Sequence, residues 1–193
     1  MKNKTIWQRL VDSVIMTDTN EPTFMYGDTS MVRLKDGAAS AVRWMIRKDM
    51  EAVLDIDFAG CLEPWLSPEY KEFLLGRSNI GMIVGEATPA GTEVRGSMLY
   101  EPSPTAINIA RMVVDIDHRR RWFAATMIRH LKLKLRPDRR YKITATVPEY
   151  CDDMLMCLKS AGFISLGYER KCFEHDGHHA DGIFMDYRMP QSG

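Results

Sequence analysis

Three features that this sequence lacks limit its class before any motif is considered. No apolar run approaches the roughly 18 residues of a membrane-spanning helix, and residues 1–16 lack the continuous apolar core of a secretory signal. The four cysteines, Cys61, Cys151, Cys157 and Cys172, have no disulfide-framework spacing. The 26 basic and 26 acidic residues balance, so bulk charge favours neither nucleic acid nor a membrane as partner. We therefore expect a reduced, cytoplasmic protein.

The chain has enough apolar sequence for a packed core. Hydrophobic residues make up 45% of its 193 residues, which is typical of one globular domain. Residues 6–15 have apolar positions at helical spacing, and residues 17–28 are rich in turn formers. We predict an N-terminal extension over residues 1–40, made of a short helix and a loop, and a folded domain over residues 41–190.

Alternating and apolar segments predict a sheet interrupted by helices. Residues 80–87, 94–100 and 105–114 are consecutive strands with short connections, which indicates an antiparallel meander. Further strands are expected at residues 42–46 and 141–147, helices after Lys48, after Ser67 and over residues 150–161, and a closing hairpin with a long loop over residues 164–173 and 182–189.

The stretch from Met112 to Ile128 carries the strongest functional signal. A strand ends at Val114, a polar loop with three arginines follows, and a helix runs from Trp122 to about Leu135. A strand that leads through a turn into a helix directs free N–H groups and the positive helix end at one point, which suits phosphate. The helix should bury one stripe, Phe123, Met127, Leu131 and Leu135. We interpret the basic residues between positions 119 and 140 as its solvated face; the alternative is a local field that attracts an anionic cofactor.

This stretch resembles the acetyl-CoA loop of the GNAT superfamily of N-acyltransferases, V-x-x-x-x-R/Q-x-x-G-x-G/A. Val114, Arg119 and Ala124 stand at matching positions, and Trp122 stands where the pattern has glycine. The resemblance covers roughly residues 41–189 and is closest to the RimI-type group, which acetylates ribosomal proteins and protein N-termini. It implies an α/β fold of GNAT type. The expected sheet is mixed and mostly antiparallel, with about six or seven strands flanked by helices, and its fourth and fifth strands splay apart.

The resemblance also implies acetyl-CoA as cosubstrate. Pantetheine would bond to the backbone of the fourth strand, and pyrophosphate to N–H groups of the following loop and helix start. The cofactor-binding residues expected from this comparison are Met112, Val113, Val114, Arg119, Arg120, Arg121, Trp122, Phe123, Ala124, Ala125 and Cys151. Because a bulky side chain disfavours positive φ, we expect the Trp122 indole to point outward or to stack near the adenine.

Acyl transfer to an amine needs a base and an acid. The resemblance places Thr146 and Leu158 where the RimI-type group has its Glu and Tyr. Glu101 and Tyr100, at the end of the third strand, are the substitutes that we predict, with Glu101 acting through a water. The alternative for Glu101 is an ordinary exposed carboxylate. Tyr150 and Cys157 are other candidate proton donors.

Three functions stay open at this point. The leading prediction is acetyl transfer from acetyl-CoA to a protein or peptide amine, at an N-terminus or a lysine, by a monomer or homodimer. The alternatives are a catalytically impaired GNAT-fold protein that binds CoA or another protein, and an acyltransferase for a different acceptor. Cys172, His175, His178 and His179 crowd together; we predict a solvated His-rich loop and no metal site, because the spacing matches no standard finger.

Overall fold

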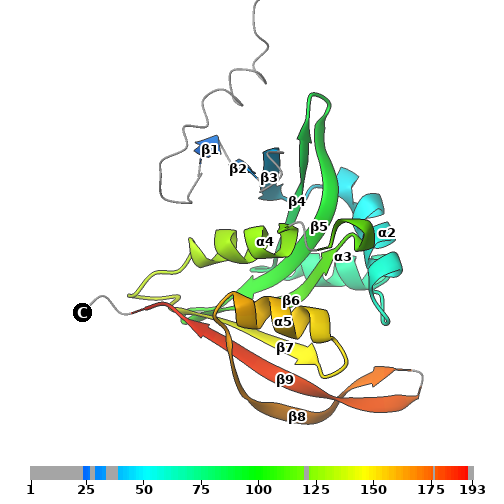
Figure 1. Cartoon of the computed structure of the whole chain (residues 1–193), viewed down its shortest axis with the longest axis vertical. Coiled ribbons are helices and arrows are strands. Elements are labelled where there is room, and N and C mark those ends of the chain that lie inside the picture. The colour runs from blue at the N-terminus through cyan, green and yellow to red at the C-terminus, as the bar shows by residue number, and fades with distance from the viewer. Residues whose placement is uncertain (1–23, 27–28, 34–38, 120–121, 176, 191–193) are drawn as a thin grey trace, which may run out of the picture.

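The computed structural model describes residues 24–26, 29–33, 39–119, 122–175 and 177–190. They contain one nine-stranded sheet in the order β1-β2-β3-β4-β5-β6-β7-β9-β8 (Figure 1). Neighbouring strands are antiparallel except β6 and β7, which are parallel. The strands are β1 Phe24–Tyr26, β2 Thr29–Arg33, β3 Ala39–Trp44, β4 Ile80–Thr88, β5 Gly91–Pro102, β6 Ala106–Val114, β7 Lys142–Pro148, β8 Ile164–His175 and β9 His178–Arg188.

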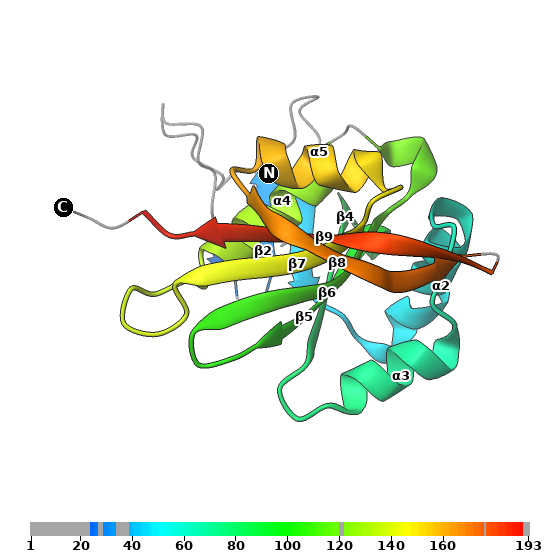
Figure 2. The same ribbon diagram turned by 90° about the horizontal axis from the view of Figure 1, so that it is seen from below.

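Helices cover both faces of this sheet. Figure 2 shows α2 and α3 on one side and α4 and α5 on the other. The helical elements are η1 Arg47–Asp49, α2 Met50–Gly60, α3 Ser67–Leu75, η2 Ile116–His118, α4 Phe123–Lys132 and α5 Asp152–Ser160. None of the helices in the described part of the chain has both the length and the apolar character that crossing a membrane requires.

Two apolar cores fill the spaces between the helices and the sheet. The larger core lies under α4 and α5, and the predicted stripe of α4, Phe123, Met127, Leu131 and Leu135, is buried in it. The smaller core joins α2 and α3 to the opposite face through Val53, Tyr70, Ile83 and Leu99. Successive side chains of β5 point to opposite faces of the sheet, so this strand contributes to both cores. Met98 and Tyr100 belong to the larger core, and Leu99 belongs to the smaller one.

The sheet begins earlier in the chain than the sequence indicated. Strands β3 to β9 are the seven that the GNAT resemblance implied, and β1 and β2 add two more at one edge. Residues 24–26 fall within the segment expected to be loop, whereas the helix expected over residues 6–15 lies outside the described residues. The edge strands are short and sit among turn-forming residues, so their alternation is too brief to reveal them.

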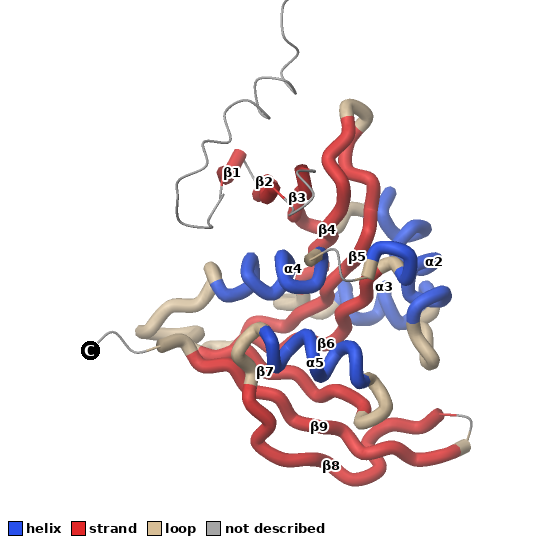
Figure 3. The backbone as a smooth tube through the Cα atoms, in the orientation of Figure 1, coloured by secondary structure: helices blue, strands red, loops and turns tan. Residues whose placement is uncertain are grey.

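The C-terminal hairpin also differs from its expectation. Strands β8 and β9 pair as far as His175 and His178, so the long loop expected between them is largely strand (Figure 3). Two register shifts interrupt the ladder, and Lys171 adopts a positive φ of 53° in one of them. The distal part of the hairpin buries little, so it lacks the apolar alternation by which strands are recognised.

Candidate functional site

Strands β6 and β7 are paired only along their first halves. Their register runs from Ala106 opposite Lys142 to Ile109 opposite Ala145 and ends there. Beyond that point β6 still pairs with β5, and β7 still pairs with β9. We call the region where residues 110–114 of β6 and residues 146–148 of β7 are no longer paired the splay. One backbone edge of β6 there has no strand partner among the described residues, so it can bond to an extended ligand.

A β-bulge explains why the strands part. Leu99 is opposite Arg111 and Tyr100 is opposite Ile109, which leaves Ala110 as an extra residue on β6. Such a residue bends its strand and increases the local twist. The bend occurs directly after the last pair with β7, so it turns the rest of β6 away from its parallel neighbour. The predicted splay of the fourth and fifth GNAT strands is therefore confirmed.

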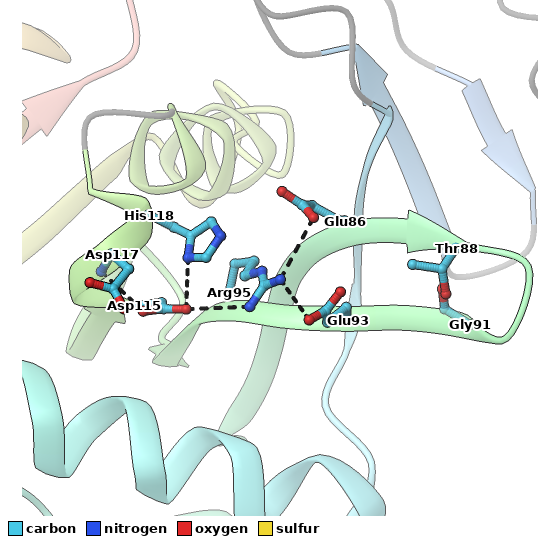
Figure 4. A network of polar contacts seen from close by, with 8 residues as sticks. All are labelled: Glu86, Thr88, Gly91, Glu93, Arg95, Asp115, Asp117 and His118. Carbon is cyan, nitrogen blue, oxygen red and sulfur yellow. Dashed lines mark hydrogen bonds and ion pairs between the residues drawn. The ribbon is translucent and has the colours of Figure 1, made fainter.

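The loop that follows β6 is held by an ion-pair network around Asp115 (Figure 4). Asp115 Oδ2 contacts His118 Nδ1 at 2.8 Å and Arg95 Nη1 at 3.5 Å, and Asp115 Oδ1 accepts from the Asp117 backbone N–H at 3.1 Å. Arg95 also pairs with Glu93 at 2.6 Å and Glu86 at 3.7 Å. The β4–β5 hairpin thereby fixes the path of the chain between β6 and α4.

Helix α4 begins at the end of this loop. Trp122 stands at its N-cap with φ 71° and ψ 2°, and its side chain does not cap the helix. The Trp122 carbonyl accepts from Thr126 N–H at 2.8 Å, so the N–H groups of Phe123, Ala124 and Ala125 precede the helical hydrogen-bond ladder. These amides and the helix dipole can hold an anion. The indole is 49% exposed, and whether it points outward or stacks near the adenine stays a prediction.

Arg119 ties the loop to two helices. Its Nη2 donates to the Gly60 carbonyl at the C-terminal end of α2 at 2.6 Å, and its Nη1 lies 3.4 Å from Asp153 of α5. Cys151, the N-cap of α5, is near enough to Arg119 and Arg111 for both cations to oppose the rise in its pKa that burial causes. Arg120 and Arg121 lie outside the described residues.

Sequence reasoning missed a buried ion pair next to the bulge. Arg111 binds the carboxylate of Asp57 on α2 with both Nε, at 3.0 Å, and Nη2. Asp57 also accepts from the Tyr70 hydroxyl at 2.6 Å, and Arg111 Nη2 donates to the Glu63 carbonyl at 2.8 Å. The signal was present in the sequence, because a charged residue within an apolar helix face and another within an apolar strand usually pair.

Titratable groups gather around that ion pair. Burial and the neighbouring Glu63 carboxylate raise the pKa of Tyr150 to about 12. Burial also raises the pKa of Cys61 to about 12, with Arg111 acting in the opposite direction and Asp57 in the same direction. Glu63 belongs to the α2–α3 connection and Tyr150 follows β7. The Glu63 carbonyl accepts from Arg111, and the Glu63 carboxylate is close enough to Tyr150 to affect its pKa. Both groups with raised pKa values are protonated at neutral pH and can donate a proton.

Comparisons with known proteins are consistent with this geometry. No protein-family model and no curated protein sequence matches the chain. Its structure is similar to that of the ribosomal-protein-S18-alanine N-acetyltransferase from Escherichia coli, with a TM-score of 0.67 at 16% identity over 80% of this chain and 96% of that one. The chain has the GNAT fold.

Two further solved structures share that GNAT fold. Arabidopsis thaliana NAA60 in complex with a bisubstrate analogue gives a TM-score of 0.67 at 14% identity over 79% of this chain and 99% of that one. Spermidine N-acetyltransferase from Vibrio cholerae, in complex with CoA and spermine, gives a TM-score of 0.61 at 17% identity over 78% of this chain and 95% of that one. The acceptors named for these proteins range from a ribosomal protein to spermidine, so the shared fold leaves the acceptor of this chain open.

Within the GNAT fold, Tyr100 and Glu101 lie on opposite faces of β5. Tyr100 is 1% exposed and packs in the core under α4. Glu101 is exposed on the α2–α3 face, and its partner across the ladder is Asn108, just before the bulge. Because successive strand residues point to opposite faces, the structure does not bring these two predicted catalytic residues together.

Two positions where the GNAT comparison expects titratable side chains hold residues that do not titrate, Thr146 and Leu158. Leu158 is completely buried in the core under α5. Thr146 is exposed on β7, opposite Phe184 of β9. Cys157, another candidate proton donor, is half-buried on α5 beside the core, and burial raises its pKa. Neither Leu158 nor Thr146 can carry a titrating proton in this chain.

The cysteine and histidines near the C-terminus lie along the β8–β9 hairpin. Glu174 is opposite His179, and His175 is opposite His178, close to the turn. Cys172, His178 and His179 are exposed. Among the described residues, no three His, Cys, Asp or Glu side chains are arranged to hold a metal ion.

Proposed function

We propose that this protein transfers the acetyl group of acetyl-CoA to a primary amine of a protein or peptide. The observation that carries the proposal is the splay, together with the start of α4 at its far end. An unpaired strand edge beside free helix N–H groups fits a cosubstrate with an amide-containing arm and a pyrophosphate. Residues 112–114 would bond to the arm, and the N–H groups of Phe123, Ala124 and Ala125 to the phosphates.

Acetyl-CoA, when bound, supplies an acetyl group activated as a thioester. The residues at the splay then have two tasks, to take a proton from the acceptor amine and to give one to the leaving sulfur. Tyr150 is our candidate donor, because burial and Glu63 raise its pKa to about 12 and so keep the phenol protonated. Glu63, whose own backbone carbonyl binds Arg111, is our candidate base. Glu101 stays the alternative base.

A peptide acceptor is favoured by the surface around Glu63. Phe58, Leu62 and Leu66, on α2 and on the connection to α3, are 74%, 63% and 59% exposed. Exposed large apolar side chains are common at protein-binding sites, and these three are close together in the sequence. A peptide with an apolar side chain next to its reacting amine can cover them, whereas a polyamine offers few apolar atoms of comparable size.

The test combines binding with turnover. Calorimetry should detect acetyl-CoA binding to the wild type, and CoA release should be measured with N-terminal peptides, a lysine peptide and spermidine. We expect turnover with a peptide. Tyr150→Phe should lower kcat by about 100-fold with little change in KM for acetyl-CoA. Tyr168→Phe is the matched control, because that tyrosine is 59% exposed on β8.

Two other results would each have a defined meaning. Comparison of Glu63→Gln with Glu101→Gln identifies the base as the residue whose loss lowers kcat more. Binding of acetyl-CoA without turnover on any amine would instead support a catalytically impaired CoA-binding protein. The complete burial of Leu158, where the RimI-type group has its acid, is the observation that favours this second function.

A further inference from the structure

A pocket lies at the other ends of the central strands from the splay. Its volume is about 290 Å³, near the lower limit of ordinary ligand sites. The ends of β3 and β5 and the starts of β4 and β6 border it, with the α4–β7 connection on the remaining side. The lining residues are Trp44, Ile80, Tyr100, Pro102, Ile107, Lys134, Arg136, Arg139 and Arg140. We call it the basic pocket.

Four of its nine lining residues are basic and none is acidic. Arg136 donates to the Leu133 and Leu135 carbonyls at 3.1 and 2.8 Å, and Arg140 Nε donates to the Ser103 carbonyl at 3.2 Å. Within the described part of the chain, no carboxylate pairs with these two arginines or with Arg139. Backbone carbonyls orient a guanidinium but do not neutralise it, so positive charge is concentrated here.

The basic residues at a helix C-terminus have an ordinary explanation, which covers only part of this pocket. Arg136 donates to the carbonyl of Leu133, the C-cap of α4, as cations at a helix C-terminus commonly do. Arg139 and Arg140 lie several residues further on and make no such contact with the helix. Helix capping therefore does not explain why Arg139 and Arg140 lie beside the apolar lining residues of this pocket.

Tyr100 supplies an independent observation. The residue is 1% exposed, and its hydroxyl has no hydrogen-bond partner among the described residues. An unsatisfied buried hydroxyl is costly, by about 1–3 kcal/mol, and natural proteins seldom retain one without a use. Burial raises the pKa of Tyr100 to about 12, and Arg140 is close enough to act in the opposite direction. The phenol is therefore a neutral donor beside a cation.

We propose that the basic pocket binds a small organic anion. Its phosphate or carboxylate group would accept hydrogen bonds from Arg139, Arg140 and the Tyr100 hydroxyl. A planar or compact apolar body would lie against Trp44 and Ile80, since the indole is 49% exposed at this rim. The site is separate from the proposed acetyl-CoA site, because the ten residues of α4 hold the two apart by about 15 Å.

Calorimetry with three probes tests this proposal at constant ionic strength. Phenyl phosphate and benzoate distinguish the two head groups, and inorganic phosphate lacks the apolar body. We expect at least one aromatic probe to bind and to bind at least tenfold more tightly than inorganic phosphate. Saturating acetyl-CoA should leave that affinity unchanged. Loss of probe binding in the presence of acetyl-CoA would assign the probe to the splay and overturn the proposal.

Variants locate the binding. Arg139→Gln combined with Arg140→Gln should weaken binding of the aromatic probe at least tenfold. Tyr100→Phe keeps the ring in the core and should weaken binding of that probe threefold or more. Arg77→Gln is the control, because Arg77 is exposed in the α3–β4 connection. Thermal unfolding and acetyl-CoA binding confirm that each variant is folded. The proposal fails if no probe binds, if inorganic phosphate binds as tightly as the aromatic probes, or if the double variant binds like the wild type.

Discussion

At the scale of single residues, Trp122 is the most informative. The GNAT loop pattern has glycine at this position, and here a tryptophan adopts the left-handed conformation that glycine would, with φ 71°. A residue with a Cβ is destabilised there by about 1–2 kcal/mol. The loop therefore places a residue with a Cβ in a conformation that favours glycine, and the indole is 49% exposed.

That strain gives the first prediction. Trp122→Gly should be more stable than Trp122→Ala by about 1 kcal/mol, because both lose the indole and only alanine retains the strained Cβ. Urea unfolding of the two variants measures the difference. Trp122→Gly should also bind acetyl-CoA at least as tightly as the wild type. Equal stability of the glycine and alanine variants would show that the left-handed backbone is not strained.

The buried ion pair gives a second prediction at the same scale. Asp57→Asn should destabilise the fold by about 3–5 kcal/mol, because Arg111 would keep its charge in a partly buried site without a carboxylate. Tyr70→Phe is the matched comparison. It removes one hydrogen bond to Asp57 and should cost about 1 kcal/mol. If both variants lowered the free energy of unfolding in urea by the same amount, the prediction would be wrong. The ion pair would then contribute no more than the Tyr70 hydrogen bond to packing α2 against the bulge.

At the scale of elements, the start of α4 makes a third prediction, in which stability and binding change in opposite directions. Ala124→Asp should stabilise the helix by about 0.3–1 kcal/mol, since a negative charge in the first turn complements the dipole. The same charge should weaken acetyl-CoA binding at least tenfold, because it would occupy the proposed phosphate position. Ala124→Asn, similar in size and uncharged, is the control. Equal affinities of the two variants in calorimetry would place the phosphates elsewhere.

Elements were predictable where their apolar pattern is long. The stripe from Phe123 to Leu135 and the meander over β4, β5 and β6 follow from periodicity alone. The splay was expected only through the GNAT resemblance, since no local pattern distinguishes Ala110 as a bulged residue. Tyr150, Glu63 and Arg111 lie far apart in the sequence, and their meeting depends on the tertiary fold. Sequence reasoning chose Tyr100 and Glu101 because both stand at the end of the third expected strand, and strand alternation places them on opposite faces.

At the scale of the whole molecule, α4 connects two chemically different ends. Its first turn offers amides at the splay, and the connection after its last turn forms the basic pocket. Between them His130 lies on α4, and burial, with Lys134 nearby, lowers its pKa to about 4. Because the folded protein keeps this histidine neutral, the stability of the fold around α4 should depend on pH.

That link gives the final prediction. An unfolded histidine has a pKa of about 6.5, so between pH 6.5 and pH 4 the unfolded chain binds a proton that folded His130 does not. Stability should fall as pH is lowered through this window, by about 1–2 kcal/mol after allowance for the half-exposed ring. Urea unfolding from pH 8 to pH 4 should show a flatter profile for His130→Gln. His178→Gln, a substitution at the exposed tip of the C-terminal hairpin, is the matched control. An unchanged profile in His130→Gln would assign acid sensitivity to other groups and leave α4 uncoupled from pH.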